Sequence, residues 1–384
     1  MANVLTDLAA DIYKAADVVG RELVGFIPSV TINAGSERAA QNDTVRSHFT
    51  RASTVNTSYS PAMTIPEGDD QTVDNKTLTI KKAANVQIPW TGEDIRHVNN
   101  GSGFETIYGD QIAQAMRGIV NAIEVEVATE AYTNASRAVG TAGTNPFASN
   151  FDIMADARKV LEDNGCPIDG RLTMVGNTAA TAALRKLATL QKANEQGTDA
   201  LVRRGELLDL QGLMIKGSAG VQSHTKGAGV GYDLNGAAAV GATTITLDGG
   251  TVNTTGIKAG DVVTFAGDSN KYVVGTGLTA VSGDIVLNNP GLVAAVADTV
   301  EMTIGNTYTA NVAFHQAAIE LAARAPEQPF GGDAAVDRMT VQDPLSGLVF
   351  EIAVYKGYGK TMIDVTTLYG VKAWKPDFIV GVLG

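Results

Sequence analysis

Residues 104–127 read FETIYGDQIAQAMRGIVNAIEVEV, and this stretch decides how the rest of the chain is interpreted. Its apolar residues recur at helical spacing along one face, whereas Arg117, Asn121 and Glu124 lie on the polar side. The pattern predicts a single helix of about 28 residues, roughly 40 Å long, which is enough to cross a whole domain. A Gly-Thr-Asn-Pro segment ending at Pro146 predicts a break after this helix.

The segment before the helix, residues 44–90, is polar and rich in Thr and Ser. Runs 45–50 and 77–81 alternate in side-chain character and predict two strands, and the cluster at residues 66–70 predicts a reversal between them. We therefore expect a long hairpin. A two-stranded ribbon is marginally stable alone in water, so it should find a partner surface on its own chain or on another copy.

Residues 1–43 are expected to form an N-terminal arm. Apolar residues recur at helical intervals over residues 4–24. This helix could pack on its own domain or reach a neighbouring subunit, and the sequence leaves both open. Residues 1–28 lack the basic lead and unbroken apolar core of a secretion signal, so export by that route is not expected.

Beyond the long helix, residues 141–233 alternate between helical and strand patterns, which indicates an α+β fold. Helices are predicted over residues 151–162 and 178–193, the second behind an Asn177 cap, with a strand over residues 172–175 between them.

After Gly217 the chain becomes rich in glycine and in short β-prone runs. Five such runs, typical of a small barrel or sandwich, cover residues 243–247, 262–265, 272–274, 285–287 and 300–304. A helix is then predicted over residues 314–324, and closing strands are predicted near residues 348–355, 362–365, 369–374 and 378–382. We expect residues 234–309 to be a β-module inserted into the core, with its two ends close together.

Composition excludes several classes of protein. The chain has 384 residues, of which 44% are hydrophobic, but no apolar run is long enough for a membrane span. A net charge of -12 disfavours a protein whose main task is gripping nucleic-acid phosphates, although it suits the inner wall of a DNA container. Cys166 is the single cysteine, so no intrachain disulfide can form and a reducing cytoplasm is the expected setting.

No standard catalytic motif is present, and we predict no catalytic residue, cofactor or metal site. The four histidines, His48, His97, His224 and His315, lie in four different segments. His97 follows acidic residues at helical spacing, but that segment is also an ordinary helix start. His315 is expected to be a hydrogen-bonded core or interface residue on a short helix. The glycines at 227–231 precede the β-module and are expected to form a flexible connection.

Three local motifs carry a family resemblance. They are Ile257-Lys-Ala-Gly-Asp-Val-Val-Thr-Phe-Ala-Gly267, Ala313-Phe-His-Gln-Ala-Ala-Ile-Glu-Leu321 and Leu368-Tyr-Gly-Val-Lys-Ala-Trp-Lys-Pro376. Together with the order of the parts, they resemble the major capsid proteins of tailed bacteriophages, which have the HK97-like fold. The closest resemblance is to the branch typified by the coat protein of phage P22, whose members carry an inserted β-barrel.

The resemblance implies a domain plan for the whole chain. Its parts are an N-terminal arm (1–43), an extended E-loop hairpin (44–90), the spine helix with peripheral domain (91–140), an α+β core (141–233), an inserted β-barrel-like domain (234–309), and the completion of the axial and peripheral domains (310–384).

The resemblance also implies a function. The chain would assemble with itself into hexamers and pentamers of an icosahedral shell that encloses double-stranded DNA without reading its sequence, as part of a virion assembled in the host cytoplasm. Implied partners are a scaffolding protein, a portal protein and, as a further candidate, a decoration protein, with no membrane. The candidate inter-subunit contacts on the hairpin are Arg46, Phe49, Arg51, Lys81 and Lys82, and each exposed ion pair there would contribute about 0–1 kcal/mol.

Three alternatives stay open. An encapsulin-type compartment would share the shell fold, although the inserted β-module counts against it. A soluble enzyme with an unrecognised site is disfavoured by the shortage of histidines, and a surface adhesin or tail protein is suggested only by the Thr- and Gly-rich β-module.

Overall fold

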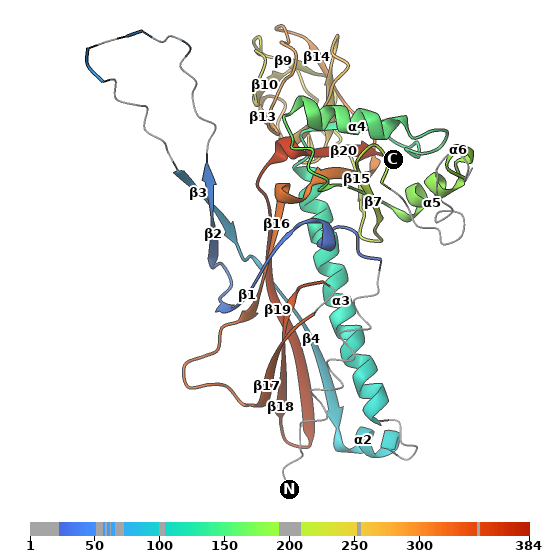
Figure 1. Ribbon diagram of the computed structural model, residues 1–384, viewed down its shortest axis with the longest axis vertical. Helices are drawn as coiled ribbons and strands as arrows, with labels where there is room; N and C mark the ends of the chain where they lie inside the picture. Colours follow the sequence, from blue (N-terminus) through green and yellow to red (C-terminus); the bar gives the residue numbers. More distant parts are fainter. Residues whose placement is uncertain are drawn as a thin grey trace.

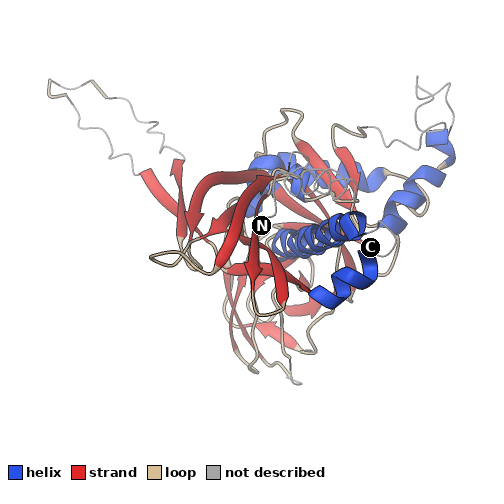
Figure 2. Cartoon of the chain, turned by 90° about the horizontal axis from the view of Figure 1, so that it is seen from below, coloured by secondary structure: helices blue, strands red, loops and turns tan. Residues whose placement is uncertain are grey.

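The computed structural model describes residues 23–50, 57, 60–61, 63–65, 73–99, 104–191, 209–251, 255–343 and 346–384. The described chain forms an elongated body around one long helix, with a six-stranded sheet along the helix and a larger sheet at one end (Figure 1). A narrow ribbon projects from the side of this body (Figure 2). The N-terminal helix predicted over residues 4–24 lies almost entirely outside the described residues.

The long helix α3, Phe104–Thr133, has 30 residues and confirms the prediction made from the apolar stretch. A short helix α2, Gly92–Asn99, precedes it. The prediction was wrong for one residue, because Glu124 was placed on the polar face but is only 2% exposed.

Six strands form the sheet that lies along α3. In spatial order they are β1 (Thr31–Ala39), β16 (Ile319–Pro326), β19 (Lys360–Ala373), β18 (Val349–Lys356) and β17 (Ala335–Gln342), and β4 (Lys82–Thr91) also pairs with β19. Only β1 and β16 run parallel. Because β4 is a full partner of β19, residues 82–91 belong to this sheet and not to the hairpin predicted over residues 44–90.

Apolar side chains from α3 and from one face of this sheet form the main core. Ile112, Met116 and Ile123 of the helix are buried in the same cluster as Trp90 of β4 and Phe350 of β18. Each fully buried side chain of this size contributes about 1.5–3 kcal/mol, so the helix and the sheet hold each other in place.

The larger sheet has twelve strands, and half of them belong to the body. These are β5 (Arg137–Gly140), β20 (Ile379–Leu383), β15 (Tyr308–His315), β6 (Leu172–Gly176) and β7 (Met214–Gly217), with β8 (Ser223–His224) paired to β15. A second apolar cluster joins them to α4 (Asp152–Asp163), α5 (Thr178–Lys186) and α6 (Ala188–Gln191). Short 3-10 helices are η1 (Ile27–Ser29), η2 (Gln316–Ala318) and η3 (Pro376–Phe378).

The other six strands of the larger sheet close on themselves, because β11 pairs with both β14 and β12. These strands, hereafter the ring, are β9 (Tyr232–Leu234), β10 (Thr244–Asp248), β11 (Val262–Phe265), β12 (Lys271–Thr276), β13 (Gly283–Leu287) and β14 (Glu301–Ile304). The ring has its own buried cluster, which includes Tyr232, Phe265 and Tyr272. β8 pairs with the start of β15, so the chain enters and leaves the ring side by side.

The hairpin predicted from the alternating runs is confirmed. β2 (Thr44–Thr50) and β3 (Val73–Thr79) form an antiparallel two-stranded sheet, hereafter the ribbon. Among the described strands they pair only with each other, and they point away from the body (Figures 1 and 2).

Two helix predictions need correction. Residues 314–324 are not helical, because they end β15, form η2 and begin β16. Residues 319–325 are all buried, so both faces of β16 are covered. In such a strand apolar and polar residues do not alternate regularly, and the sequence pattern cannot distinguish it from a buried helix. The helix predicted over residues 178–193 is interrupted at Leu187, so that α5 ends at Lys186 and α6 follows as a separate helix. Its predicted cap is confirmed, because Asn177 Oδ1 accepts from Ala180 N at 2.7 Å.

Candidate functional site

The base of the ribbon is fixed to the body. Val45 packs on a small buried cluster that contains Ile80 and Leu368. The amide of Ile80 donates to the carbonyl of Asp43 at 2.9 Å. Gly370 of β19 allows β3 to approach closely, because a Cβ atom at this position would lie 2.4 Å from the carbonyl oxygen of Thr79, the last residue of β3. The ribbon therefore leaves the body from a defined position.

The basic residues predicted to contact another subunit are separated by the structure. Arg46 on β2 and Lys81 beyond β3 are exposed. The side chain of Phe49 and all of Arg51 lie outside the part of the chain that the structure describes. Two of the five predicted contacts are thus available on the surface at the base of the ribbon.

Lys82, the fifth predicted contact, is engaged within its own chain. Its Nζ atom lies 2.6 Å from Oε2 of Glu126 on α3, and this hydrogen bond raises the pKa of Lys82. Both side chains are partly exposed, so the pair contributes about 0–1 kcal/mol. Lys82 thus links β4 to α3 within its own chain, and its contact with another subunit stays a prediction.

Four large apolar side chains are more than nine-tenths exposed, and all lie in connections at the extremities. Met63 and Ile65 lie between β2 and β3, Phe330 lies between β16 and β17, and Tyr358 lies between β18 and β19. Single exposed apolar residues are common, so these four are candidates for contact with another protein only where they lie in a projecting part of the chain.

The segment that leads into β1 is anchored on α3 by Glu124. Its Oε1 atom accepts from the amides of Gly25 and Phe26 at 2.7 and 2.8 Å, and Oε2 accepts from Ile27 at 3.0 Å. The hydroxyl of Ser218 also donates to Oε1, at 2.6 Å. A buried carboxylate therefore binds the free amides at the start of η1, where a negative charge is stabilised by the helix dipole.

Ion pairs link three strands of the six-stranded sheet, β1, β17 and β18. Glu351 is buried between two guanidinium groups, 2.5 Å from Arg38 and 2.7 Å from Arg338. Arg338 also contacts Asp333, and its hydrogen bond lowers the pKa of that carboxyl to about 2. The connection that carries Phe330 is therefore held where it enters β17.

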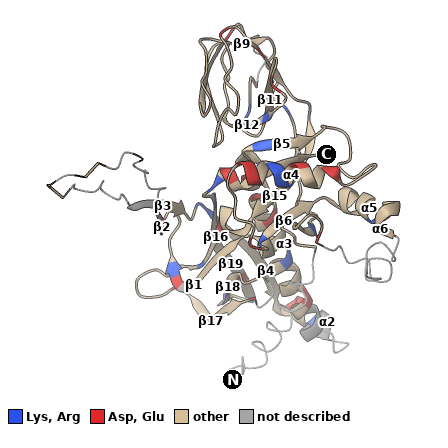
Figure 3. Ribbon diagram, turned by 45° about the horizontal axis from the view of Figure 1, so that its top comes forward, with Lys and Arg blue, Asp and Glu red and all other residues tan. Residues whose placement is uncertain are grey.

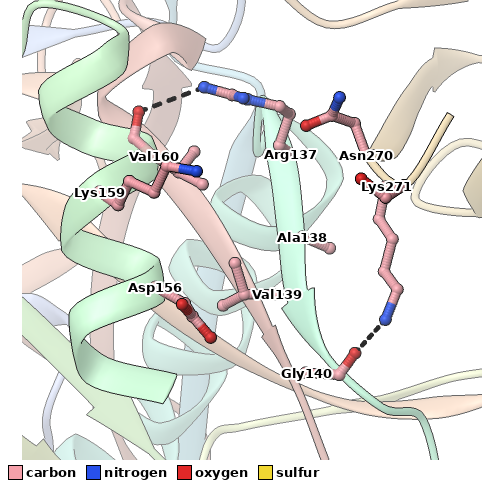
Figure 4. A pocket seen from close by; sticks show the side chains of 10 residues that line it. Arg137, Ala138, Val139, Gly140, Asp156, Lys159, Val160, Asn270 and Lys271 are labelled. Carbon is pink, nitrogen blue, oxygen red and sulfur yellow. Dashed lines mark hydrogen bonds between the residues drawn. The ribbon is translucent and has the colours of Figure 1, made fainter. Parts of the chain in front are cut away.

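A depression of about 380 Å³ lies between α4, β5 and the turn before β12. Figure 4 shows Lys159 and Asp156 on the α4 side and Lys271 on the other, with the Lys271 ammonium turned to the carbonyl of Gly140. Arg137 likewise donates to acceptors of the protein. Since two of the cations are already bound and Asp156 adds an opposite charge, the depression offers little to an anionic ligand.

Two buried histidines pair with carboxylates. His224 Nε2 lies 2.8 Å from Asp261, and His315 Nε2 lies 2.9 Å from Asp169. The Nδ1 atom of His315 accepts from Ala317, so Nε2 carries the proton and donates to Asp169, which lowers the pKa of that carboxyl. His315 is thus a hydrogen-bonded core residue as predicted, although it ends a strand.

The remaining candidates for chemistry are weak. Burial raises the pKa of the Cys166 thiol to about 12, so it is not a thiolate at neutral pH. The described residues contain no group of His, Cys, Asp and Glu that could hold a metal ion. No helix in the described ranges is long and apolar enough to cross a membrane. Figure 3 shows acidic and basic residues interspersed over the body.

No family model matches the chain, and no curated protein matches it. Solved structures do. A protein of Mycobacterium phage Che8 is 15% identical, with a TM-score of 0.48 over 89% of this chain and 84% of the other. The capsid of cyanophage P-SCSP1u is 11% identical, with a TM-score of 0.49 over 92% and 86%. A virus-like particle from Pyrococcus furiosus is 9% identical, with a TM-score of 0.44 over 98% and 100%.

Several of the structural neighbours are phage capsids. They also include the capsid of a gene transfer agent particle. At these identities and scores, the function has to be inferred from the geometry of the chain itself.

Proposed function

We propose that the chain is the major capsid protein of a tailed bacteriophage, a non-enzymatic subunit of an icosahedral shell that encloses double-stranded DNA. The observation that carries the proposal is the ribbon. It projects from the body on a fixed base, its described strands pair only with each other, and exposed Met63 and Ile65 lie in the connection between these strands. Such a ribbon gains little burial from its own chain, so another copy is the natural place for it to be buried.

The remaining parts support the same assignment. In the capsid plan α3 is the spine helix, the ribbon is the E-loop, and the six-stranded sheet belongs to the peripheral domain. The sheet around β15 and β20 belongs to the axial domain, and the ring is the β-barrel inserted in the P22-like branch. Phe330 and Tyr358 add two further exposed tips, as expected for a subunit with several neighbours in a closed lattice.

The partners follow from this assignment. The subunit forms hexamers and pentamers, assembles around a scaffolding protein with a portal at one vertex, and becomes part of the virion after assembly in the host cytoplasm. A decoration protein would bind the finished lattice. The net charge of -12 fits a wall that encloses DNA without adhering to it.

Negative-stain electron microscopy of the full chain tests the proposal, with the protein expressed alone and together with its candidate scaffolding protein. Closed shells tens of nanometres across are expected. Replacing Met63 and Ile65 with serine should lower the yield of shells, because it removes apolar contact at the ribbon tip. A uniform small oligomer under both conditions would refute the capsid assignment and favour an enzyme or a binding protein.

A further inference from the structure

The ring meets the body at a small buried junction. The chain enters the ring after β8 and leaves it before β15, where His224 and Tyr308 are paired in register. His224 belongs to the body and Asp261 to the ring, and their 2.8 Å bond crosses the junction. Both are buried, with 6% and 1% of their surfaces exposed. The junction, hereafter the neck, consists of Tyr132, His224, Gly260, Asp261 and Tyr308.

The Asp261 carboxylate is fully used within the neck. Besides His224, it accepts from the amide of Gly227 at 3.1 Å and from the amide of Lys258 at 2.8 Å. A Cβ atom at Gly227 would lie 2.1 Å from the carbonyl oxygen of Gly256. The expectation of a flexible connection at residues 227–231 is therefore wrong for this glycine, which is needed for close packing around the carboxylate.

Aromatic packing brings the end of α3 into the neck. The His224 ring lies between Tyr132, in the last turn of α3, and Tyr308, with ring centroids 5.5 and 5.3 Å away. The Tyr308 hydroxyl donates to the carbonyl of Gly260 at 2.7 Å. Gly260 has a φ of +90°, and a Cβ atom there would lie 2.9 Å from Tyr132. A residue of the ring thus packs directly against the helix.

Two further ties join the ring to the same end of the helix. Asn288 donates from its side-chain nitrogen to the carbonyls of Thr133 and Ala135, both at 2.8 Å. β12 pairs with β5, which places Tyr272 opposite Arg137. With these additional contacts, the ring cannot rotate relative to the body as it could if only the two connecting segments joined them.

We infer that the neck locks the ring to the C-terminal end of α3, so that the ring and the helix move as one rigid body whenever the helix is reoriented. The His224–Asp261 bond is the central element, because it joins a buried side chain of the body to a buried side chain of the ring. The inference concerns the mechanics of the subunit and holds whether or not the chain forms a shell.

Distances between spin labels test the inference in the full chain. Labels on Val240→Cys in the ring and Asn121→Cys on α3 are suitable because both native side chains are exposed. The buried Cys166 thiol, with its pKa of about 12, should remain unlabelled. We expect a narrow distance distribution in the parent protein and a distinctly broader one after His224→Ala. Exchange of the Gly227 and Lys258 amides should become about tenfold faster or more.

Matched variants separate locking from general stability. His315→Ala breaks the other histidine–carboxylate bond, at the opposite end of β15 from Tyr308, and should leave the distribution narrow. His224→Gln keeps a side-chain donor and should restore most of the narrow distribution.

Two results would overturn the inference. One is a distribution that stays as narrow in His224→Ala as in the parent, or that broadens equally in His315→Ala. The other is loss of amide protection at Ile245 and Ile285, in the core of the ring, together with the neck, because the bond would then stabilise the ring itself and not its orientation.

Discussion

Replacing Glu124 with alanine should be among the most damaging single changes in the described chain. The side chain is 2% exposed and lies on the helix that organises the body. It accepts three backbone amides and one hydroxyl from two other segments, at distances of 2.6–3.0 Å. The alanine variant removes all of these acceptors at once.

The expected loss follows from the groups that remain. A buried donor without a partner costs about 1–3 kcal/mol, and three amides of residues 25–27 would be left in that state. Water entering the vacated space offsets part of this cost, so we expect a loss of about 3–5 kcal/mol in the free energy of unfolding. Glu124→Gln keeps one acceptor oxygen and should lose about 1–3 kcal/mol.

Urea unfolding of the full-length subunit measures these losses. The fluorescence of Trp90, buried beside α3, is a suitable probe. Glu126→Ala is the matched control, because this carboxylate lies two residues further along the same helix but forms only a partly exposed pair with Lys82. The control should lose no more than about 1 kcal/mol. A Glu124→Ala subunit as stable as this control would refute the anchoring role.

Three further changes give sharp expectations. Gly370→Ala should cost about 1–3 kcal/mol in urea unfolding, because the new Cβ would lie 2.4 Å from Thr79 O, and an unchanged midpoint would count against the close approach. The Arg338 pair lowers the pKa of Asp333 from 3.8 to about 2, so its contribution to stability is present above pH 3.8 and is lost as the pH falls toward 2. Asp333→Asn should flatten acid unfolding in that window, and superimposable acid curves would contradict this. Phe330→Ser should leave the melting temperature unchanged but lower the yield of shells seen by electron microscopy, since the side chain is fully exposed, and normal yields would remove it from the contact surface.

The elements that were predicted correctly have a sequence that fits only one periodicity, either that of a helix or that of a strand. Helix α3 is apolar on one face only, and the ribbon alternates over two short runs separated by a turn. The helix prediction for residues 314–324 was wrong because β16 is buried on both faces, which removes the alternation of apolar and polar residues that indicates a strand. Helical spacing and strand spacing are then equally well satisfied.

The anchoring residues could not be predicted, because their partners are distant in sequence. Glu124 is separated from the amides that it binds by 97–99 positions, and nothing near it distinguishes it from a solvated glutamate. His224 and Asp261 are 37 positions apart, and glycine content at 227–231 suggested flexibility where the structure shows close packing. The pairing of Lys82 with Glu126 was not predicted for the same reason, since Glu126 is on another element.

The anchors and the exposed tips belong to one physical arrangement. Residues 25–27 before β1 are bound by Glu124, the base of the ribbon rests on the cluster around Ile80, and the ring is held at the neck. Each of these contacts orders its part of the chain before a partner binds. A segment that is already ordered loses less conformational entropy on binding. A projection on a loose base would have to be ordered during association, and that cost would be repeated in every subunit of a lattice. In a closed shell, where each contact is weak and many must form together, changes at the buried bases should therefore impair assembly as strongly as changes at the exposed tips.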